Sequence, residues 1–209
     1  MKKTGFLFLF AAIFVVASTA TAFAQNPNFN ASRTFEFDPD KTGGSVAYWK
    51  NGIGQTDSTC KTNFGLNLEK NAALSDNVSS GAVLNGLKGV TVIAGDTMGF
   101  DIKAGSPCGA GAPRFNVSYI LPDGVTTGFS FVGGCANSTL SPAPTPGWVR
   151  ATAALQNPAQ AFPIIPPGST LQSVVLIVDE PGKYVLDNIQ YKLYYADKPG
   201  NSGLAPSCP

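Results

Sequence analysis

Acidic side chains with alternating spacing lie near the start of the chain, in the segment FEFDPDKTG at residues 35–43. Glu36, Asp38 and Asp40 place several hard oxygen ligands within five residues, a donor set that suits Ca²⁺ far better than zinc. The run from Asp38 to Gly43 also matches the opening of an EF-hand loop, but Trp49 stands where that loop requires a bidentate Glu. A true EF-hand is therefore not expected.

A fourth acidic residue, Asp187, lies in the last strong strand pattern, where it alternates with Val185, Ile189, Tyr191 and Leu193. If that side of the strand faces the core, the carboxylate needs backbone donors, a cation or a metal. Sandwich domains often pair their first and last strands. The sequence therefore predicts a structural calcium site formed by Glu36, Asp38, Asp40 and Asp187. The alternative is a solvated acidic turn, with Asp187 accepting backbone N–H bonds.

Four aromatic residues are candidates for stacking on sugar rings, with amide and carboxylate side chains as hydrogen-bonding neighbours. Tyr48 and Trp49 lie beside the Gly-rich stretch KNGIGQ, Trp148 follows a Pro/Gly loop, and Tyr194 lies near the end of the last strand pattern. The alternative is that both tryptophans are core or edge residues, which is the more common position of Trp in a sandwich.

The chain contains no histidine, so Ser–His–Asp and Cys–His catalysis, HExxH zinc sites and imidazole pH switches are excluded. With 14 Lys+Arg against 13 Asp+Glu, it also lacks the basic balance of a nucleic-acid-binding protein. Glycoside hydrolysis by two carboxylates needs no histidine, but Glu36, Glu69 and Glu180 are the only glutamates and form no evident acid–base pair. A carboxylate-dependent glycosidase is therefore a remote alternative.

The four cysteines, an even number, favour two disulfides if the chain is exported. Residues 114–121 and 126–132 are predicted to form a hairpin around Pro-Asp-Gly, with Leu121 opposite Val125. That register places Cys135 opposite residue 111, close to Cys108, so we expect a Cys108–Cys135 bridge. Cys60–Cys208 follows by elimination. The absence of a CxxC spacing argues against redox catalysis and zinc binding.

Most of the remaining chain alternates apolar and polar residues between Gly/Pro turns, which is typical of antiparallel strands. Phe115, Val117, Tyr119 and Leu121 share one side of their strand, and Phe129 and Phe131 continue this apolar pattern. Residues 171–179 predict a central strand, and residues 184–195 a strand that returns antiparallel to it. The expected fold is all-β: a single antiparallel β-sandwich, jelly-roll-like and stabilised by disulfides.

The C-terminal segment SVVLIVDEPGKYVLDNIQYK resembles the last two strands of jelly-roll carbohydrate-binding modules, which end in an apolar strand, a Gly-containing turn and a Y-x-x-D-N-I strand. In several such families the aspartate of the last strand, here Asp187, helps to hold a structural calcium with acidic residues near the N-terminus. Glu36 or Asp38 are the matching positions. The resemblance covers about 20 residues and implies a fold more than a function.

The first 24 residues predict a cleaved signal peptide, with Lys2 and Lys3, a short apolar run and an Ala22-Phe23-Ala24 cleavage signature. Residues 25–34 are expected to form a flexible lead-in and residues 35–209 the sandwich. The product would be secreted, periplasmic or on the cell surface, with no membrane span after cleavage. We expect a non-catalytic protein that binds a polysaccharide or an extracellular protein through loop aromatics. The alternative is a structural or adhesive surface protein that binds no sugar.

Overall fold

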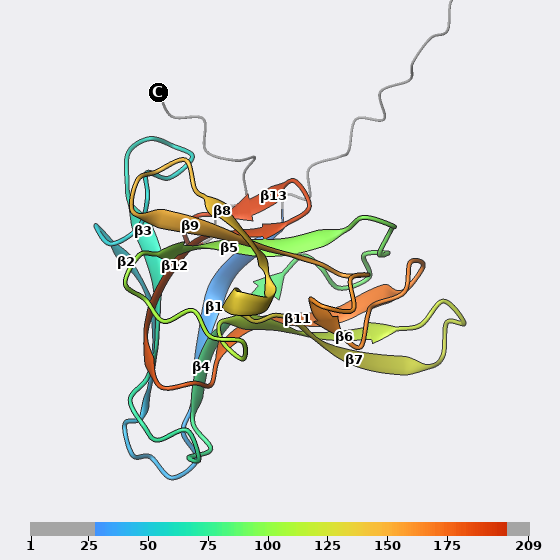
Figure 1. Ribbon diagram of the computed structural model, residues 1–209, viewed down its shortest axis with the longest axis horizontal. Coiled ribbons are helices and arrows are strands. Elements are labelled where there is room, and N and C mark those ends of the chain that lie inside the picture. Colours follow the sequence, from blue (N-terminus) through green and yellow to red (C-terminus); the bar gives the residue numbers. More distant parts are fainter. Residues whose placement is uncertain (1–27, 200–209) are drawn as a thin grey trace, which may run out of the picture.

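The computed structural model describes residues 28–199, which form two antiparallel sheets packed face to face (Figure 1). The six-stranded sheet contains, in spatial order, β1 (Asn30–Phe37), β4 (Ser79–Asn85), β11 (Thr170–Val178), β6 (Arg114–Ile120), β7 (Thr127–Gly133) and β10 (Ala161–Phe162). The predicted antiparallel β-sandwich is confirmed.

The seven-stranded sheet forms the other layer, with β5, β8 and β9 lying over β6, β7 and β11 in Figure 1. It contains, in spatial order, β2 (Ser45–Asn51), β3 (Phe64–Lys70), β12 (Gly182–Tyr191), β5 (Thr97–Lys103), β9 (Trp148–Ala154) and β8 (Thr139–Pro142), with β13 (Tyr194–Ala196) paired to β12. One short 3₁₀ helix, η1 (Cys135–Asn137), connects β7 to β8. Within the described residues no helix is long and apolar enough to cross a membrane.

The core lies between the two sheets and is built from alternate residues of the strands on both sides. Phe100 of β5 and Phe115 of β6 meet across it with ring centroids 5.9 Å apart. Tyr184 and Tyr191 of β12 are fully buried, and the Tyr191 hydroxyl donates to the carboxylate of Asp96 at 3.0 Å. Each sheet therefore has one face packed against the core and one face directed outward.

One boundary and one strand connection differ from the sequence predictions. β1 begins at Asn30, so residues 30–34, predicted as a flexible lead-in, pair with β4 in the sheet. The strand pattern at residues 171–179 corresponds to β11, but the residues that follow it enter the opposite sheet as β12 and, after a turn, β13. The turn before β12 therefore crosses between the layers rather than closing a hairpin. The predicted signal peptide lies outside the described residues.

The Cys108–Cys135 disulfide is present, with a Cα–Cα distance of 4.9 Å, and confirms the first predicted pairing. It ties the loop before β6 to η1, at the end of the β6–β7 hairpin. Cys60 is also disulfide-bonded, but its predicted partner, Cys208, lies outside the described residues.

Candidate functional site

The outer face of the six-stranded sheet carries an unusual number of exposed phenylalanines. Phe37, Phe129, Phe131 and Phe162 each leave 44–46% of their surface in solvent. Exposed aromatic side chains gathered on one face mark a binding surface more often than a chance arrangement. We call this surface the aromatic face. It consists of Arg33, Phe35, Phe37, Val83, Arg114, Asn116, Phe129, Phe131, Phe162, Val175 and Ile177.

The strand register aligns six of these side chains into one row that crosses the whole sheet. From β10 to β1 the paired residues are Phe162, Phe131, Asn116, Val175, Val83 and Arg33. Six strands about 4.8 Å apart make this row about 24 Å long. From β10 to β1, the row offers two aromatic rings, then an amide, then two aliphatic side chains, and finally a guanidinium.

Local sequence explains why these aromatic side chains lie on the outer face. On β7, the residues that alternate with the phenylalanines turn inward: Val132 packs in the core, and the buried hydroxyl of Ser130 donates to the carbonyl of Pro163 at 2.6 Å. On β4, a Cβ at Gly81 would lie 2.6 Å from the ring of Phe35, so glycine allows that ring to lie across the strand.

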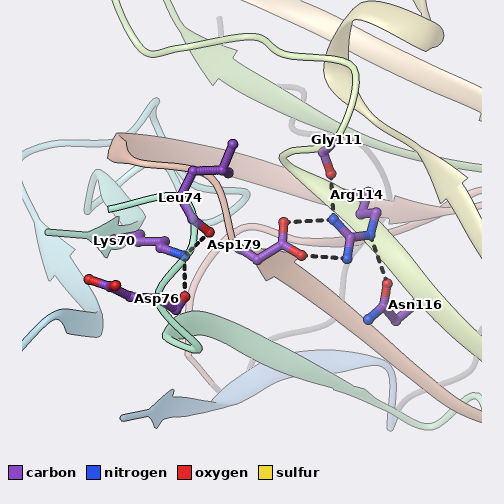
Figure 2. Close-up of polar contacts among 7 residues, drawn as sticks. All are labelled: Lys70, Leu74, Asp76, Gly111, Arg114, Asn116 and Asp179. Atoms are coloured by element: carbon purple, nitrogen blue, oxygen red, sulfur yellow. Dashed lines mark hydrogen bonds and ion pairs between the residues drawn. The ribbon is translucent and has the colours of Figure 1, made fainter. Parts of the chain in front are cut away.

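Arg114 is the most constrained polar group on this face (Figure 2). Its Nη1 and Nη2 donate to both carboxylate oxygens of Asp179 at 2.7 and 2.6 Å, and Nη1 also donates to the carbonyl of Gly111 at 2.7 Å. Nε donates to Oδ1 of Asn116 at 3.0 Å, and the guanidinium lies 4.9 Å from the ring centroid of Phe131. These contacts fix the planar guanidinium against the ring before any ligand arrives.

Hydrogen-bonding capacity remains at the centre of the face. The amide nitrogen of Asn116 has no hydrogen-bond partner among the described residues, because the contact with Arg114 uses only its oxygen. One N–H of Nη2 of Arg114 likewise has no partner within residues 28–199, since a guanidinium carries five donors and four of them are used. Both groups lie beside the exposed ring of Phe131.

A polar cavity of about 430 Å³ adjoins the face at the ends of β1, β4, β6 and β11. It is lined by Phe37, Lys70, Leu74, Ser75, Asp76, Asn77, Val78, Ser79, Arg114, Asn116, Ile177 and Asp179. Lys70 is only 2% exposed, and its ammonium donates to the carbonyls of Leu74 and Asp76 at 3.3 and 2.7 Å (Figure 2). Lys70 thereby holds the loop that forms one wall, while Arg114 and Asp179 form another.

The predicted aromatic ligands lie elsewhere. Trp148 is only 7% exposed, with the ammonium of Lys103 5.8 Å from its ring centroid. Trp49 packs against the core, and its Nε1 donates to the carbonyl of Ala31 at 2.9 Å. These positions match the alternative, in which both tryptophans serve the fold. Tyr48 is 38% exposed on the seven-stranded sheet, and Tyr194 lines a separate cavity.

The predicted calcium ligands do not come together. The carboxylate of Asp38 accepts bonds from the N–H groups of Thr42, Gly43 and Gly44, which lower its pKa along with the hydroxyl of Thr42. Within residues 28–199, no group of three or more Asp, Glu or Cys side chains has an arrangement that could hold a metal ion.

The other acidic side chains of the predicted set are separated from one another. Glu36 accepts the N–H of Ala47 at 3.0 Å, and Asp40 is exposed in the turn after β1. Asp187 belongs to the opposite sheet. These carboxylates do not fit the predicted calcium site, and we derive no chemistry from a metal here.

Asp187 is buried, but not in the core. A bulge between Asp187 and Gln190, with Asn188 at a φ of 45°, reverses the alternation, so Leu186 and Ile189 face the core and Asp187 faces outward. The loop after β2 covers it there: the N–H of Gln55 donates to Oδ2 at 2.6 Å, and the N–H of Asn188 to Oδ1 at 2.7 Å.

Further nitrogen donors surround the neighbouring carboxylate of Asp101, which pairs with Asp187 in the register. Nε2 of Gln55 and Nδ2 of Asn188 donate to its Oδ2 at 2.6 and 2.8 Å, and Nε of Arg150 lies 2.7 Å from its Oδ1. Burial, the largest effect, raises the pKa of Asp187 to about 8, with a further rise from the charge of Asp101. The N–H donors of Gln55 and Asn188 lower this pKa, but burial outweighs them.

The comparisons with known proteins concern structure. No protein-family model matches the chain, and no curated protein matches it in sequence. The structure is similar to the family 11 carbohydrate-binding module of the cellulosomal cellulase Lic26A-Cel5E of Clostridium thermocellum, at 17% identity, over 84% of this chain and 91% of that chain, with a TM-score of 0.40.

Two further solved structures are similar at comparable levels. One belongs to the carbohydrate-binding modules of promiscuous specificity from the β-sandwich superfamily (16% identity, 81% of this chain, 63% of that chain, TM-score 0.37). The other is an exo-β-agarase (12% identity, 80% of this chain, 25% of that chain, TM-score 0.37). The chain is thus similar to carbohydrate-binding modules, as predicted, at low identity and low TM-score.

Proposed function

We propose that the protein is an exported, non-catalytic binding protein that holds an extended glycan on the aromatic face. The row that crosses all six strands carries the proposal, because its exposed rings and the free amide nitrogen of Asn116 lie beside the preorganised guanidinium of Arg114. A sugar has apolar C–H faces and a rim of hydroxyl groups. It can therefore stack on Phe131 and Phe162 while its hydroxyls bond to Asn116 and Arg114.

The length of the row favours a chain over a single sugar. Phe162 and Phe131 lie at the β10 end of the row, and the polar cavity adjoins the same face at the ends of β1, β4, β6 and β11, with Phe37 in its lining. In that cavity both oxygens of Asp179 are held by Arg114, so this carboxylate serves orientation rather than acid–base catalysis. Export rests on the predicted signal peptide and agrees with the disulfide.

The test is retention on a panel of insoluble polysaccharides, followed by affinity electrophoresis with soluble ones. Phe131→Ala is the informative variant, because its ring is exposed and touches the central arginine. We expect retention of the wild type on at least one polysaccharide and a loss of about thirtyfold or more in affinity for the variant, the level of an interface hot spot. Val125→Ala is the matched control, since Val125 is 81% exposed at the tip of the β6–β7 turn.

Two results would contradict the proposal. Equal retention of Phe131→Ala and the wild type would exclude the aromatic face as the site. No retention on any polysaccharide would exclude glycan binding on the aromatic face and favour the structural or adhesive alternative. Circular dichroism and melting curves of both variants should match the wild type closely, because substitutions of exposed side chains change stability little.

A further inference from the structure

A second cavity, of about 390 Å³, lies away from the aromatic face, between the turn that precedes β5 and the turn that joins β12 to β13. It is lined by Ile93, Ala94, Gly95, Asp96, Thr97, Gln190, Lys192, Leu193 and Tyr194. Because it belongs to the end of the seven-stranded sheet, no residue of the aromatic face contributes to it.

The floor of this cavity holds a buried carboxylate with one unpaired oxygen. Asp96 is 4% exposed, and its Oδ2 accepts three groups: the N–H of Ile93 at 2.9 Å, the hydroxyl of Tyr191 at 3.0 Å and the ammonium of Lys192 at 2.9 Å. Its Oδ1 has no hydrogen-bond partner among the described residues. Because a carboxylate oxygen is an acceptor only, Oδ1 can accept a hydrogen bond from an O–H or N–H group of a ligand.

The walls of the cavity are apolar and project into solvent. Ile93 is 47% exposed on one side and Leu193 is 58% exposed on the other. Beside Leu193, the ring of Tyr194 is held by the core, with its centroid 6.3 Å from that of Phe29. An apolar rim over a hydrogen-bonding floor fits a compact molecule with one apolar face and a polar edge.

The turn that carries Lys192 has a strained backbone, and its conformation positions two side chains of the cavity. Lys192 has a φ of 54°, a left-handed conformation that residues other than Gly and Asn adopt uncommonly. Its N–H donates to the carbonyl of Thr97 at 3.1 Å, which anchors the turn to β5. This conformation places the ammonium on Asp96 and Leu193 at the rim. Backbone strain of this kind concentrates at binding sites.

The charges of the cavity point to a neutral ligand. The ammonium of Lys192 and the carboxylate of Asp96 form an ion pair and are the only Lys, Arg, Asp or Glu side chains in the lining. An ionic ligand would therefore meet no uncompensated partner. The volume lies near the lower end of the range for small-molecule sites, which suits one ring rather than a chain.

We propose that this cavity is a second binding site, which takes a single neutral pyranose ring or a similar cyclic polyol. One face of the ring packs against Leu193 and Tyr194, and a hydroxyl donates to Oδ1 of Asp96. The site shares the ligand class of the proposed function but contains no residue of the aromatic face. Binding at each of the two sites can therefore be tested independently.

The experiment is a ¹H–¹⁵N NMR titration of the protein with the methyl glycosides of glucose, galactose, mannose and xylose, each up to about 50 mM, well above the millimolar Kd that corresponds to about 4 kcal/mol of binding. We expect at least one of them to shift the amides of Gly95, Thr97 and Leu193 in a saturable way. Ala94→Trp should weaken that binding at least tenfold, because Ala94 is exposed in the lining and a bulky ring there fills the cavity without touching the Asp96 bonds.

Ala104→Trp is the matched control, because Ala104 is also exposed but follows the opposite end of β5. This variant and Phe131→Ala should bind the glycoside with unchanged affinity. No saturable shift with any of the four glycosides, or unchanged binding by Ala94→Trp, would overturn the inference. Monosaccharide binding here without polysaccharide retention would contradict the proposed function alone, and the reverse result would contradict only the second site.

Discussion

The carboxyl group of Asp187 should make the stability of the fold fall as the pH rises. Burial and the nearby carboxylates of Asp101 and Asp57 raise its pKa to about 8, although the N–H groups of Gln55 and Asn188 lower it. The ordinary value is 3.8. Between these two pH values the folded protein holds a proton that the unfolded chain has released, so the free energy of unfolding decreases with increasing pH.

The expected size of the effect is large for a protein of this length. The difference between 3.8 and about 8 corresponds to about 5–6 kcal/mol of stability, lost at up to about 1.4 kcal/mol per pH unit. Asp57, whose pKa burial also raises, acts in the same direction. Asp38, Glu69 and Asp123 have lowered pKa values and act in the opposite direction, but only as the pH falls below about 4.

The assay is urea unfolding at intervals between about pH 5 and pH 9, at constant ionic strength and with a chelator present. We expect the free energy of unfolding to decline and then level off above about pH 8. In Asp187→Asn most of this slope should disappear, because an amide does not ionise. Its overall stability also changes, since the amide nitrogen would face a backbone N–H, and so the slope is the quantity to compare.

Constant or increasing stability between pH 5 and pH 8 would refute this reasoning. Calcium provides a second check, because Asp187 was predicted from the sequence to bind it. The nitrogen donors around Asp187 lead us to expect no change of the melting temperature at millimolar Ca²⁺. An increase that reverses the pH dependence would show that Asp187 is a metal-bound carboxylate instead.

Three further predictions concern positions that hold the fold. Replacing Cys108 and Cys135 together by Ser opens a loop spanning 27 residues, and should cost about 3.5 kcal/mol in urea unfolding under non-reducing conditions. Gly54→Ala would overlap the backbone carbonyl of Phe64, so we expect a loss of about 1–3 kcal/mol by the same measurement. Trp148→Ala should cost about 3–5 kcal/mol, because the ring is buried, while the polysaccharide retention of the folded fraction stays unchanged.

The sequence was sufficient for the fold class and for one disulfide, because both depend on local patterns. Alternation of apolar residues between Gly/Pro turns indicates antiparallel strands, and the flexible loop around Cys108 can reach Cys135 even if the strand register is inexact. The face occupied by Asp187 could not be predicted in this way. One bulge at Asn188 reverses the alternation within β12, and no residue pattern in that strand marks the position.

The aromatic face was not predicted because the predicted register of the β6–β7 hairpin differs from the observed one by a single residue. Closing the β6–β7 hairpin with Leu121 opposite Val125 places Phe131 opposite Phe115, on the core side. In the structure the N–H of Leu121 instead bonds to the carbonyl of Thr126, and Phe131 pairs with Asn116. Since side chains alternate along a strand, this shift moves every residue of β7 to the other face.

The observed register agrees with the polar side of β6, but it is not the more hydrophobic choice for β7. Arg114, Asn116 and Ser118 already identify the solvent side of β6, and pairing them with Phe129 and Phe131 leaves Ser130 and Val132 to turn inward. The pattern alone favours the opposite choice, because two phenylalanines outside and a serine inside is the less hydrophobic arrangement for the core. The fold accepts it because Pro163 satisfies the buried hydroxyl of Ser130. An arrangement that exposes two aromatic rings and buries a hydroxyl gives up apolar burial that the reverse register would keep. Such a loss is expected where the exposed surface has a function of its own.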